Sequence, residues 1–88
     1  MMKKILVGID GSARGARALH WAARRASREG ANLELLSVVD SRKVKEAGAS
    51  IEDVQEAVEA NLDKARNFVA KRYPNMQVEM CIAEGEVV

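Results

Sequence analysis

The chain alternates short apolar runs with longer segments whose apolar residues recur at helical spacing. Three runs, each long enough for one strand, occupy residues 5–9, 33–39 and 77–83. The first two are almost continuously apolar, which is typical of strands buried on both faces of a parallel sheet. In the third, Gln77 and Glu79 alternate with Val78 and Met80. This alternation predicts an edge strand with one side facing water.

The segment after the first run has the pattern of an amphipathic helix between Ser12 and Gly30. Its arginines lie opposite an apolar stripe made of Ala16, Leu19, Ala22, Ala23 and Ala26. Ser12 is a favoured N-cap residue, and Gly30 provides a common stop at the carboxyl end. We therefore expect a helix whose arginine side faces solvent and whose alanine-rich side packs on the sheet.

A second amphipathic helix is predicted after a polar connection that covers residues 41–50. Ser50 and Asp53 form a version of the capping box, and the helix continues until "YPN" interrupts it. Its apolar stripe comprises Ile51, Val54, Val58, Leu62, Ala65 and Val69. The acids of its first turn, and Lys71 and Arg72 in its last turn, both match the helix dipole.

The order of elements is β-α-β-α-β in a single domain covering residues 1–88, which predicts an α/β fold with a parallel sheet and right-handed crossovers. If the strands run outward in one direction, the strand order is 3-2-1 and both helices cover the same face. The opposite face and the outer edge of the first strand are then uncovered, and such surfaces favour association. We therefore expect a homo-oligomer, most simply a dimer, formed through that face or edge.

Composition narrows the class of protein further. Hydrophobic residues make up 48% of the 88 residues and charged residues 31%, as in soluble globular domains. The net charge of +1 argues against a nucleic-acid or membrane partner, although the first half of the chain is basic and the second half acidic. The single cysteine, Cys81, excludes an internal disulfide, and the apolar runs are too short for a signal peptide or a membrane span. We expect a cytoplasmic protein.

The corner where the first strand joins the helix, "GIDGS", is the main candidate for a ligand site. In open parallel sheets, ligands bind beyond the carboxyl ends of the strands, and Asp10 and Asp40 both follow such ends. Gly8 and Gly11 allow a group to approach the backbone closely, and the helix start near Ser12 favours an anion. The same residues also suit a tight turn without any ligand. Neither G-x-G-x-x-G nor G-x-x-x-x-G-K-[ST] is present, so both interpretations stay open.

Other chemistry-bearing residues carry weaker signals. His20 is the sole histidine, with no serine or cysteine placed by sequence to use it, so we expect a structural or surface role and no enzyme activity. Cys81 within a strand is most often an inert small hydrophobe. Trp21 falls among the arginines, which predicts a cation–π contact with Arg17 or Arg25, or alternatively a contact surface. No spacing of ligands fits a metal, because two aspartates at strand ends are too few oxygens for Mg²⁺.

The residues "KKILVGIDGSARGARALHWAARRASREGANLELLSVVD" resemble the opening of the universal stress protein family. The shared features are the lysine-led first strand, the "GIDGS" corner, the "AL-x-WA" helix and a second strand ending in "VVD". The resemblance continues through the second helix into "VEMCIAEGEVV", which is similar to the family's third strand and the turn after it. It implies a three-layer parallel fold of the adenine nucleotide alpha hydrolase-like or Rossmann-like type, here truncated to its N-terminal part.

The resemblance also implies where ATP would bind. In family members that bind ATP, the aspartate after strand one approaches the ribose and phosphates, and this residue is Asp10 here. Gly8, followed by Ile9, would lie beside the nucleotide, and backbone groups of Val38 would recognise adenine. The family's phosphate motif, G-x2-G-x9-G-[ST], follows a fourth strand, and the sequence reaches Val88 before it. We therefore expect ATP binding to be weak.

Two functions follow from these residues. The first is a stress-associated module with a partial adenine-nucleotide pocket. The second is an interaction or dimerisation module that binds no nucleotide, or a fragment of a longer universal stress protein. A phosphoacceptor receiver domain is excluded because it needs an aspartate at the end of strand three, where "CIAEGE" offers only Glu84.

Overall fold

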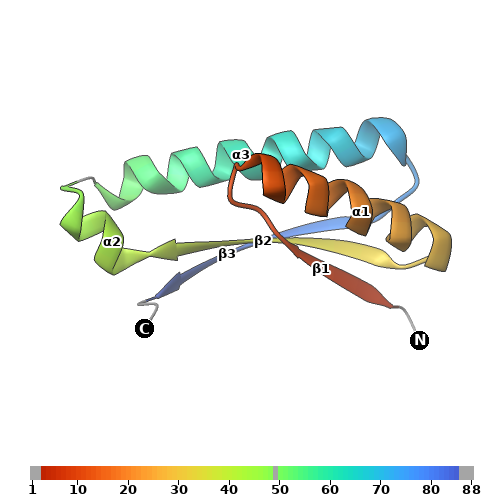
Figure 1. Cartoon of the computed structure of the whole chain (residues 1–88), viewed down its shortest axis with the longest axis horizontal. Coiled ribbons are helices and arrows are strands. Elements are labelled where there is room, and N and C mark those ends of the chain that lie inside the picture. Colours follow the sequence, from red (N-terminus) through yellow and green to blue (C-terminus); the bar gives the residue numbers. More distant parts are fainter. Residues whose placement is uncertain (1–2, 49, 86–88) are drawn as a thin grey trace.

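The computed structural model describes residues 3–48 and 50–85, which form a three-stranded parallel sheet with helices on one face (Figure 1). The strands are β1 (Lys4–Gly8), β2 (Asn32–Asp40) and β3 (Val78–Gly85), and the helices are α1 (Ala13–Glu29), α2 (Ser41–Glu46) and α3 (Ile51–Arg72). The order across the sheet is β1-β2-β3, so β2 pairs with both other strands. The predicted small α/β fold with a parallel sheet is confirmed.

Both long helices begin where their capping residues predicted. The Ser12 hydroxyl accepts a hydrogen bond from the N–H of Gly15, and the Ser50 hydroxyl accepts one from the N–H of Asp53. Gly30, with a left-handed φ of 64°, ends α1. These signals act within one turn of the chain, which is why the sequence is enough to locate them.

Residues 41–46 form the short helix α2, where the sequence analysis expected a polar connection. Arginine, lysine and glutamate favour helix, and they fill most of this segment. Gly48, with a φ of +70°, then turns the chain towards α3. With Val44 as its one apolar residue, the segment has no hydrophobic period that could have predicted the helix.

The core lies between the sheet and the two long helices, which run side by side above the same face (Figure 1). Its largest fully buried side chains are Leu33, Leu35 and Val39 from β2 and Val69 from α3. The helix α1 contributes Leu19 and a surface of small residues made of Ala22, Ala23 and Ala26. The alanines let α1 approach the sheet closely, mainly over β1.

The other face of the sheet carries no helix or strand from the described residues. The predicted uncovered face is therefore present, whereas the expectation, drawn from the apolar runs, that the first strands are buried on both faces is wrong. Val7 is only 7% exposed, whereas its neighbour Leu6 is 58% exposed, and Val38 on the same side of β2 is 54% exposed. A continuous apolar run does indicate a strand, but burial of its second face needs a further layer of protein. We call this surface the open face.

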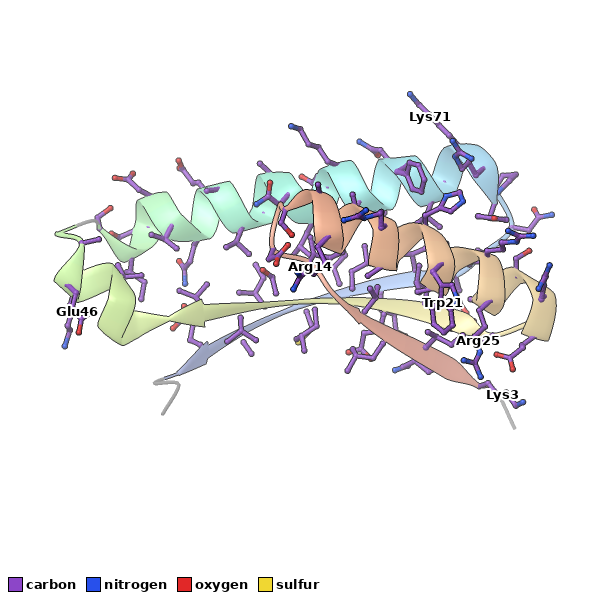
Figure 2. The ribbon with its side chains drawn as sticks, viewed as in Figure 1. Lys3, Arg14, Trp21, Arg25, Glu46 and Lys71 are labelled. Carbon is purple, nitrogen blue, oxygen red and sulfur yellow. The ribbon has the colours of Figure 1, made fainter. Side chains whose placement is uncertain are left out.

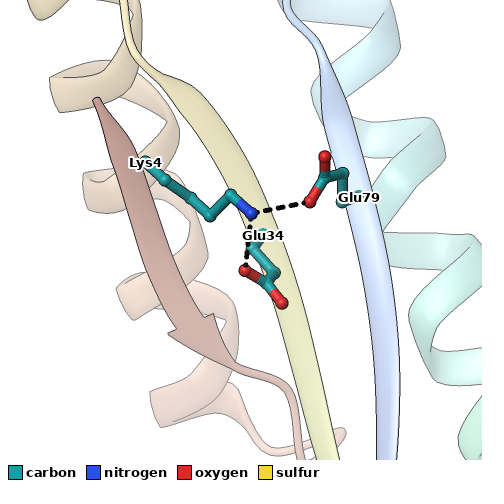
Figure 3. A network of polar contacts seen from close by, with 3 residues as sticks. All are labelled: Lys4, Glu34 and Glu79. Atoms are coloured by element: carbon teal, nitrogen blue, oxygen red, sulfur yellow. Dashed lines mark ion pairs between the residues drawn. The ribbon is translucent and has the colours of Figure 1, made fainter. Parts of the chain in front are cut away.

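A network of charges crosses the open face near the amino ends of the strands (Figure 3). The Nζ atom of Lys4 lies 3.4 Å from Oε2 of Glu34 and 2.9 Å from Oε2 of Glu79. The two glutamates are register partners on β2 and β3, where like charges repel. The lysine offsets that repulsion, and the hydrogen bond to Glu79, followed by that to Glu34, raises the pKa of Lys4 above its usual 10.5.

Candidate functional site

The candidate site begins where the backbone leaves β1. Ile9 is 8% exposed, and its N–H donates to the carbonyl of Leu36 over 2.8 Å. The Ile9 carbonyl accepts a hydrogen bond of 2.9 Å from the buried hydroxyl of Ser37. These two bonds hold the chain against β2 for one residue beyond the strand. The next residue, Asp10, is therefore fixed at the carboxyl edge of the sheet.

Asp10 is tied into the turn that starts α1. The N–H and the hydroxyl of Ser12 donate to Oδ1 of Asp10 over 2.9 and 2.6 Å, and the Ser12 hydroxyl accepts from the N–H of Gly15 over 3.0 Å. These hydrogen bonds from Ser12 lower the pKa of Asp10 below its usual 3.8, with a smaller contribution from the charge of Arg14. The carboxylate is therefore an integral part of the turn as well as a candidate ligand.

Two glycines are required for the shape of this corner. Gly11 has a φ of +79°, and a Cβ there would lie 2.9 Å from Nδ2 of Asn61. A Cβ at Gly15 would lie 2.5 Å from Oδ1 of Asp10, so the carboxylate rests against the first turn of α1. Gly15 was not among the residues predicted for the site. The sequence did contain a signal, because Gly15 falls inside the predicted helix. Glycine there destabilises a helix by about 1 kcal/mol relative to alanine, so its presence indicates a local steric requirement.

A pocket of about 250 Å³ opens between this corner and α3. Its walls include Asp10 and Ser12 from the corner and Asn61, Lys64 and Phe68 from α3. The α3 residues were not predicted as site residues, because nothing in the local sequence links them to a corner some fifty residues earlier. The pocket combines a carboxylate, an amide and an ammonium group around an apolar floor.

The four predicted site residues reach one end of the sheet but divide between its two faces. Ile9 points to the helix side, where it lines the pocket. Gly8 pairs with Leu36 in register, and Val38 follows two residues later, so both belong to the open face. A Cβ at Gly8 would meet nothing within 4 Å. Asp10 lines the same pocket, where it is bonded to Ser12 at the start of α1.

Several of the weaker candidates are also placed by the structure. The guanidinium of Arg25 lies 5.2 Å from the centre of the Trp21 ring, which confirms one of the two predicted cation–π partners. The imidazole of His20 lies 6.0 Å from the ring of Phe68. Cys81 is exposed on the open face, so it is not buried as a core hydrophobe would be.

Two searches for other kinds of site gave no candidate. Among the side chains that the structure describes, no group of three or more from histidine, cysteine, aspartate or glutamate is placed to hold a metal ion. Within residues 3–48 and 50–85, no helix has the length and apolar character needed to cross a membrane. The side chain of Asp40, the second aspartate at a strand end, lies outside the described residues.

The fold and the corner together define a small parallel α/β protein with its candidate site at the carboxyl edge of the sheet. The family model described as "Universal stress protein family" matches residues 1–87. The chain therefore belongs to the universal stress protein family, as the "GIDGS" corner and the neighbouring segments predicted. No curated protein sequence matches the chain significantly.

Proposed function

We propose that this chain is a universal stress protein-type module that binds the adenosine part of an adenine nucleotide at the carboxyl edge of β1 and β2. The observation that carries the proposal is Gly8. Its φ is not positive, and a side chain there would project into open space. Glycine inside a strand costs roughly 0.5–1 kcal/mol relative to alanine, so the described fold gains nothing from it. A ligand that must touch the strand backbone explains the glycine.

The backbone of Val38 supplies groups suited to adenine. In a parallel pair, alternate residues direct both peptide groups to the same neighbouring strand. Leu36 directs its carbonyl to the β1 side, where it accepts from Ile9, so Val38 has the same orientation two residues later. There the chain from β1 has already turned away at Asp10. One N–H and one carbonyl on the same residue match the N1 acceptor and the N6 donor of adenine.

Asp10 is suited to the ribose rather than to the phosphates. Its lowered pKa keeps it anionic at neutral pH, and both bonds from Ser12 use Oδ1. Among the described residues, Oδ2 accepts no hydrogen bond, so it is available to a ribose hydroxyl. The same anion lies at the start of α1, where it repels phosphate from the position that a helix terminus would otherwise favour. We therefore propose weak binding in which ATP gains little over adenosine.

Calorimetry with adenosine, ATP and guanosine tests this proposal. Adenosine and ATP are expected to bind with similar dissociation constants, and guanosine should bind more weakly because its ring edge reverses the donor and acceptor. Gly8→Val and Asp10→Asn should each weaken adenosine binding by roughly tenfold, equivalent to about 1.4 kcal/mol. Asn32→Val, which adds a branched side chain at the amino end of the open face, is the matched control. Tight ATP binding that survives Gly8→Val would contradict the proposal.

The wider assignment also rests on family membership. We propose a stress-response role without catalysis, in the cytoplasm, on a sheet of the adenine nucleotide alpha hydrolase-like or Rossmann-like type. A universal stress protein-type fold supports this combination, and an α/β sheet with its site at the carboxyl edge is consistent with it. Comparing the expression of the chain in resting and stressed cells tests the role directly.

An interaction module is the second candidate function, favoured by the exposure of the open face. Leu6 and Val38 are 58% and 54% exposed, and Leu36 lies between them in the register. A second copy that packs on this face would bury them, and each buried leucine contributes about 2 kcal/mol. Sedimentation at low micromolar concentration should show a species larger than 9.6 kDa. Leu6→Thr should shift it towards monomer, and a wild-type monomer would exclude this candidate.

A further inference from the structure

We infer that the outer face of α1 docks onto the outer face of the amino-terminal half of α3 in a second copy of this chain. The arginine face of α1 consists of Arg17, Trp21, Arg24, Arg25 and Arg28. The acidic face of α3 consists of Glu52, Asp53, Glu56, Glu59 and Asp63. All ten residues are exposed, and neither face belongs to the open face of the sheet or to the pocket beside Asp10.

Most charges of these two faces have no ion-pair partner among the described side chains. On the arginine face, Arg25 pairs with Glu29 at 3.3 Å. Among the side chains that the structure describes, those of residues 3–39, 44–48 and 50–84, the other three arginines form no ion pair, and neither do the five acids of the acidic face. The two surfaces carry opposite charges of similar number, so they are complementary in the way that guides protein association.

Trp21 gives the arginine face an apolar anchor. The side chain is 60% exposed, although tryptophan has the largest apolar surface of any residue in this chain. Arg25 lies against one side of its ring, and Arg17 and Arg24 are one helical turn away on either side. Figure 2 shows Trp21 and Arg25 projecting together from α1. Exposed tryptophan ringed by arginine is the composition of an interface hot spot.

The acidic face offers a matching receptor. By helical spacing, Ala57 and Ala60 lie among the acids, and both are exposed. These small residues leave room for an indole ring between carboxylates. The two faces also match in length. Arg17 and Arg28 span about 16 Å along α1, at 1.5 Å per residue, and Glu52 and Asp63 span the same distance along α3. A tryptophan over the two alanines therefore allows the flanking arginines to reach acids on both sides.

This contact cannot form inside one chain. The helices α1 and α3 run side by side in the same direction over the sheet (Figure 1). Trp21 and Arg25 lie beside Lys4 and the start of β1, at the opposite edge of the sheet from β3. A second copy presents the missing acidic partner. Because two different surfaces meet, each copy keeps one of each unused, and association continues beyond a pair unless a ring closes. Exposed ion pairs make the contact weak and sensitive to salt.

Charge reversal with the single tryptophan as reporter tests the inference. Triple reversal of Arg17, Arg24 and Arg28 to glutamate should abolish concentration-dependent burial of Trp21, measured by acrylamide quenching and by sedimentation. The same loss should follow reversal of Glu56, Glu59 and Asp63 to lysine. Combining all six changes leaves the net charge unchanged and should restore self-association. Raising the salt concentration from 0.05 to 0.5 M, a roughly tenfold change, should weaken association in the wild type and in the six-fold variant.

Matched controls separate this contact from other causes. Lys71→Glu makes the same charge change as Arg24→Glu at an exposed position in the last turn of α3, two turns beyond Asp63, and it should leave association unchanged. Circular dichroism checks that each variant is folded, and Leu6→Thr removes association through the open face without affecting quenching of Trp21. The inference is overturned if Trp21 stays equally exposed at all concentrations, or if the six-fold variant does not recover. Capture of polyglutamate or an oligonucleotide on the arginine face, without self-association, would assign that face to another partner and also overturn it.

Discussion

The carboxylate of Asp10 occupies the space that a side chain at Gly15 would need, since a Cβ there would lie 2.5 Å from Oδ1. The helix α1 has no acidic residue in its own first turn, where an acid would favour the dipole. Asp10 supplies that negative charge from outside the helix, and Gly15 makes the approach feasible. The turn and the candidate ligand site therefore share one carboxylate.

The effect of Gly15→Ala on stability should depend on the residue at position 10. The substitution should destabilise the wild type and stabilise a variant that lacks the Asp10 carboxylate. In the wild-type background, the methyl group displaces the Asp10 carboxylate from Ser12, and we expect a loss in the free energy of unfolding. With Asp10→Ala already present, the same substitution gains helix propensity and should stabilise the protein by about 0.5–1 kcal/mol. Urea unfolding of the four proteins measures both effects. If Gly15→Ala stabilises the wild type, the Asp10 carboxylate does not prevent a side chain at position 15, and this account is contradicted.

Gly8→Val should leave the fold intact or stabilise it slightly. The added side chain enters open space, and valine suits an extended strand better than glycine does, by up to about 1 kcal/mol. The measurement is the thermal unfolding midpoint of Gly8→Val, compared with the midpoints of the wild type and of the matched control Asn32→Val. An unfolded Gly8→Val protein would mean that the glycine serves packing, and the ligand argument would lose its main support.

The contribution of Asp10 to stability should depend on pH in the acid range. Its folded pKa lies below the usual 3.8, because Ser12 stabilises the charged form. The contribution is therefore complete above that value and is lost as the pH falls through the folded pKa. The difference in unfolding free energy between wild type and Asp10→Asn should shrink steadily below pH 4. A difference that is constant from pH 6 to pH 2.5 would exclude the assigned cause.

Lys4→Met should destabilise the sheet at neutral pH by leaving Glu34 and Glu79 side by side. The pKa of Lys4 is raised, so its contribution is complete below 10.5 and is lost as the pH rises through the folded value. Lys3→Met is the matched control. It removes the same charge one residue earlier, and Lys3 does not contribute to the pKa shift of Lys4. Chemical unfolding at pH 7 and pH 11 should show a larger cost of Lys4→Met at pH 7. Equal effects of the two substitutions at pH 7 would contradict this account.

Features fixed by neighbouring residues were predictable from the sequence. Ser12, Ser50 and Gly30 act within one turn, and the apolar stripes of α1 and α3 report a helical period directly. The family resemblance rests on a corner of the same local kind. The placement of Asp10 and Gly8 at the carboxyl end of the sheet followed from parallel topology, whereas Val38 was singled out only through the family resemblance.

Features that depend on distant partners were not predictable. The roles of Asn61 and Lys64 beside the corner depend on how α3 crosses the sheet, and no local pattern encodes that crossing. The apolar residues of β1 and β2 suggested burial on both faces, but a residue type cannot say whether a covering layer is present. A glycine at position 15, inside a helix, is visible in the sequence. The reason for it depends on the position of the Asp10 carboxylate, which only the structure gives.

The bridge from Lys4 to Glu79 has a kinetic consequence. It joins the first strand to the last through the central strand, so the network can close only after nearly the whole chain has been synthesised and both crossovers have formed (Figure 3). Contacts between residues so far apart are slow to form, because a long loop must close before they stabilise anything. Pairing of β1 with β2, and packing of α1 on both, can come earlier. Glu34 and the other edge of β2 then have no partner strand until β3 is added. During that interval the central strand is itself an edge strand, and it is the part of this fold most exposed to pairing with the wrong chain.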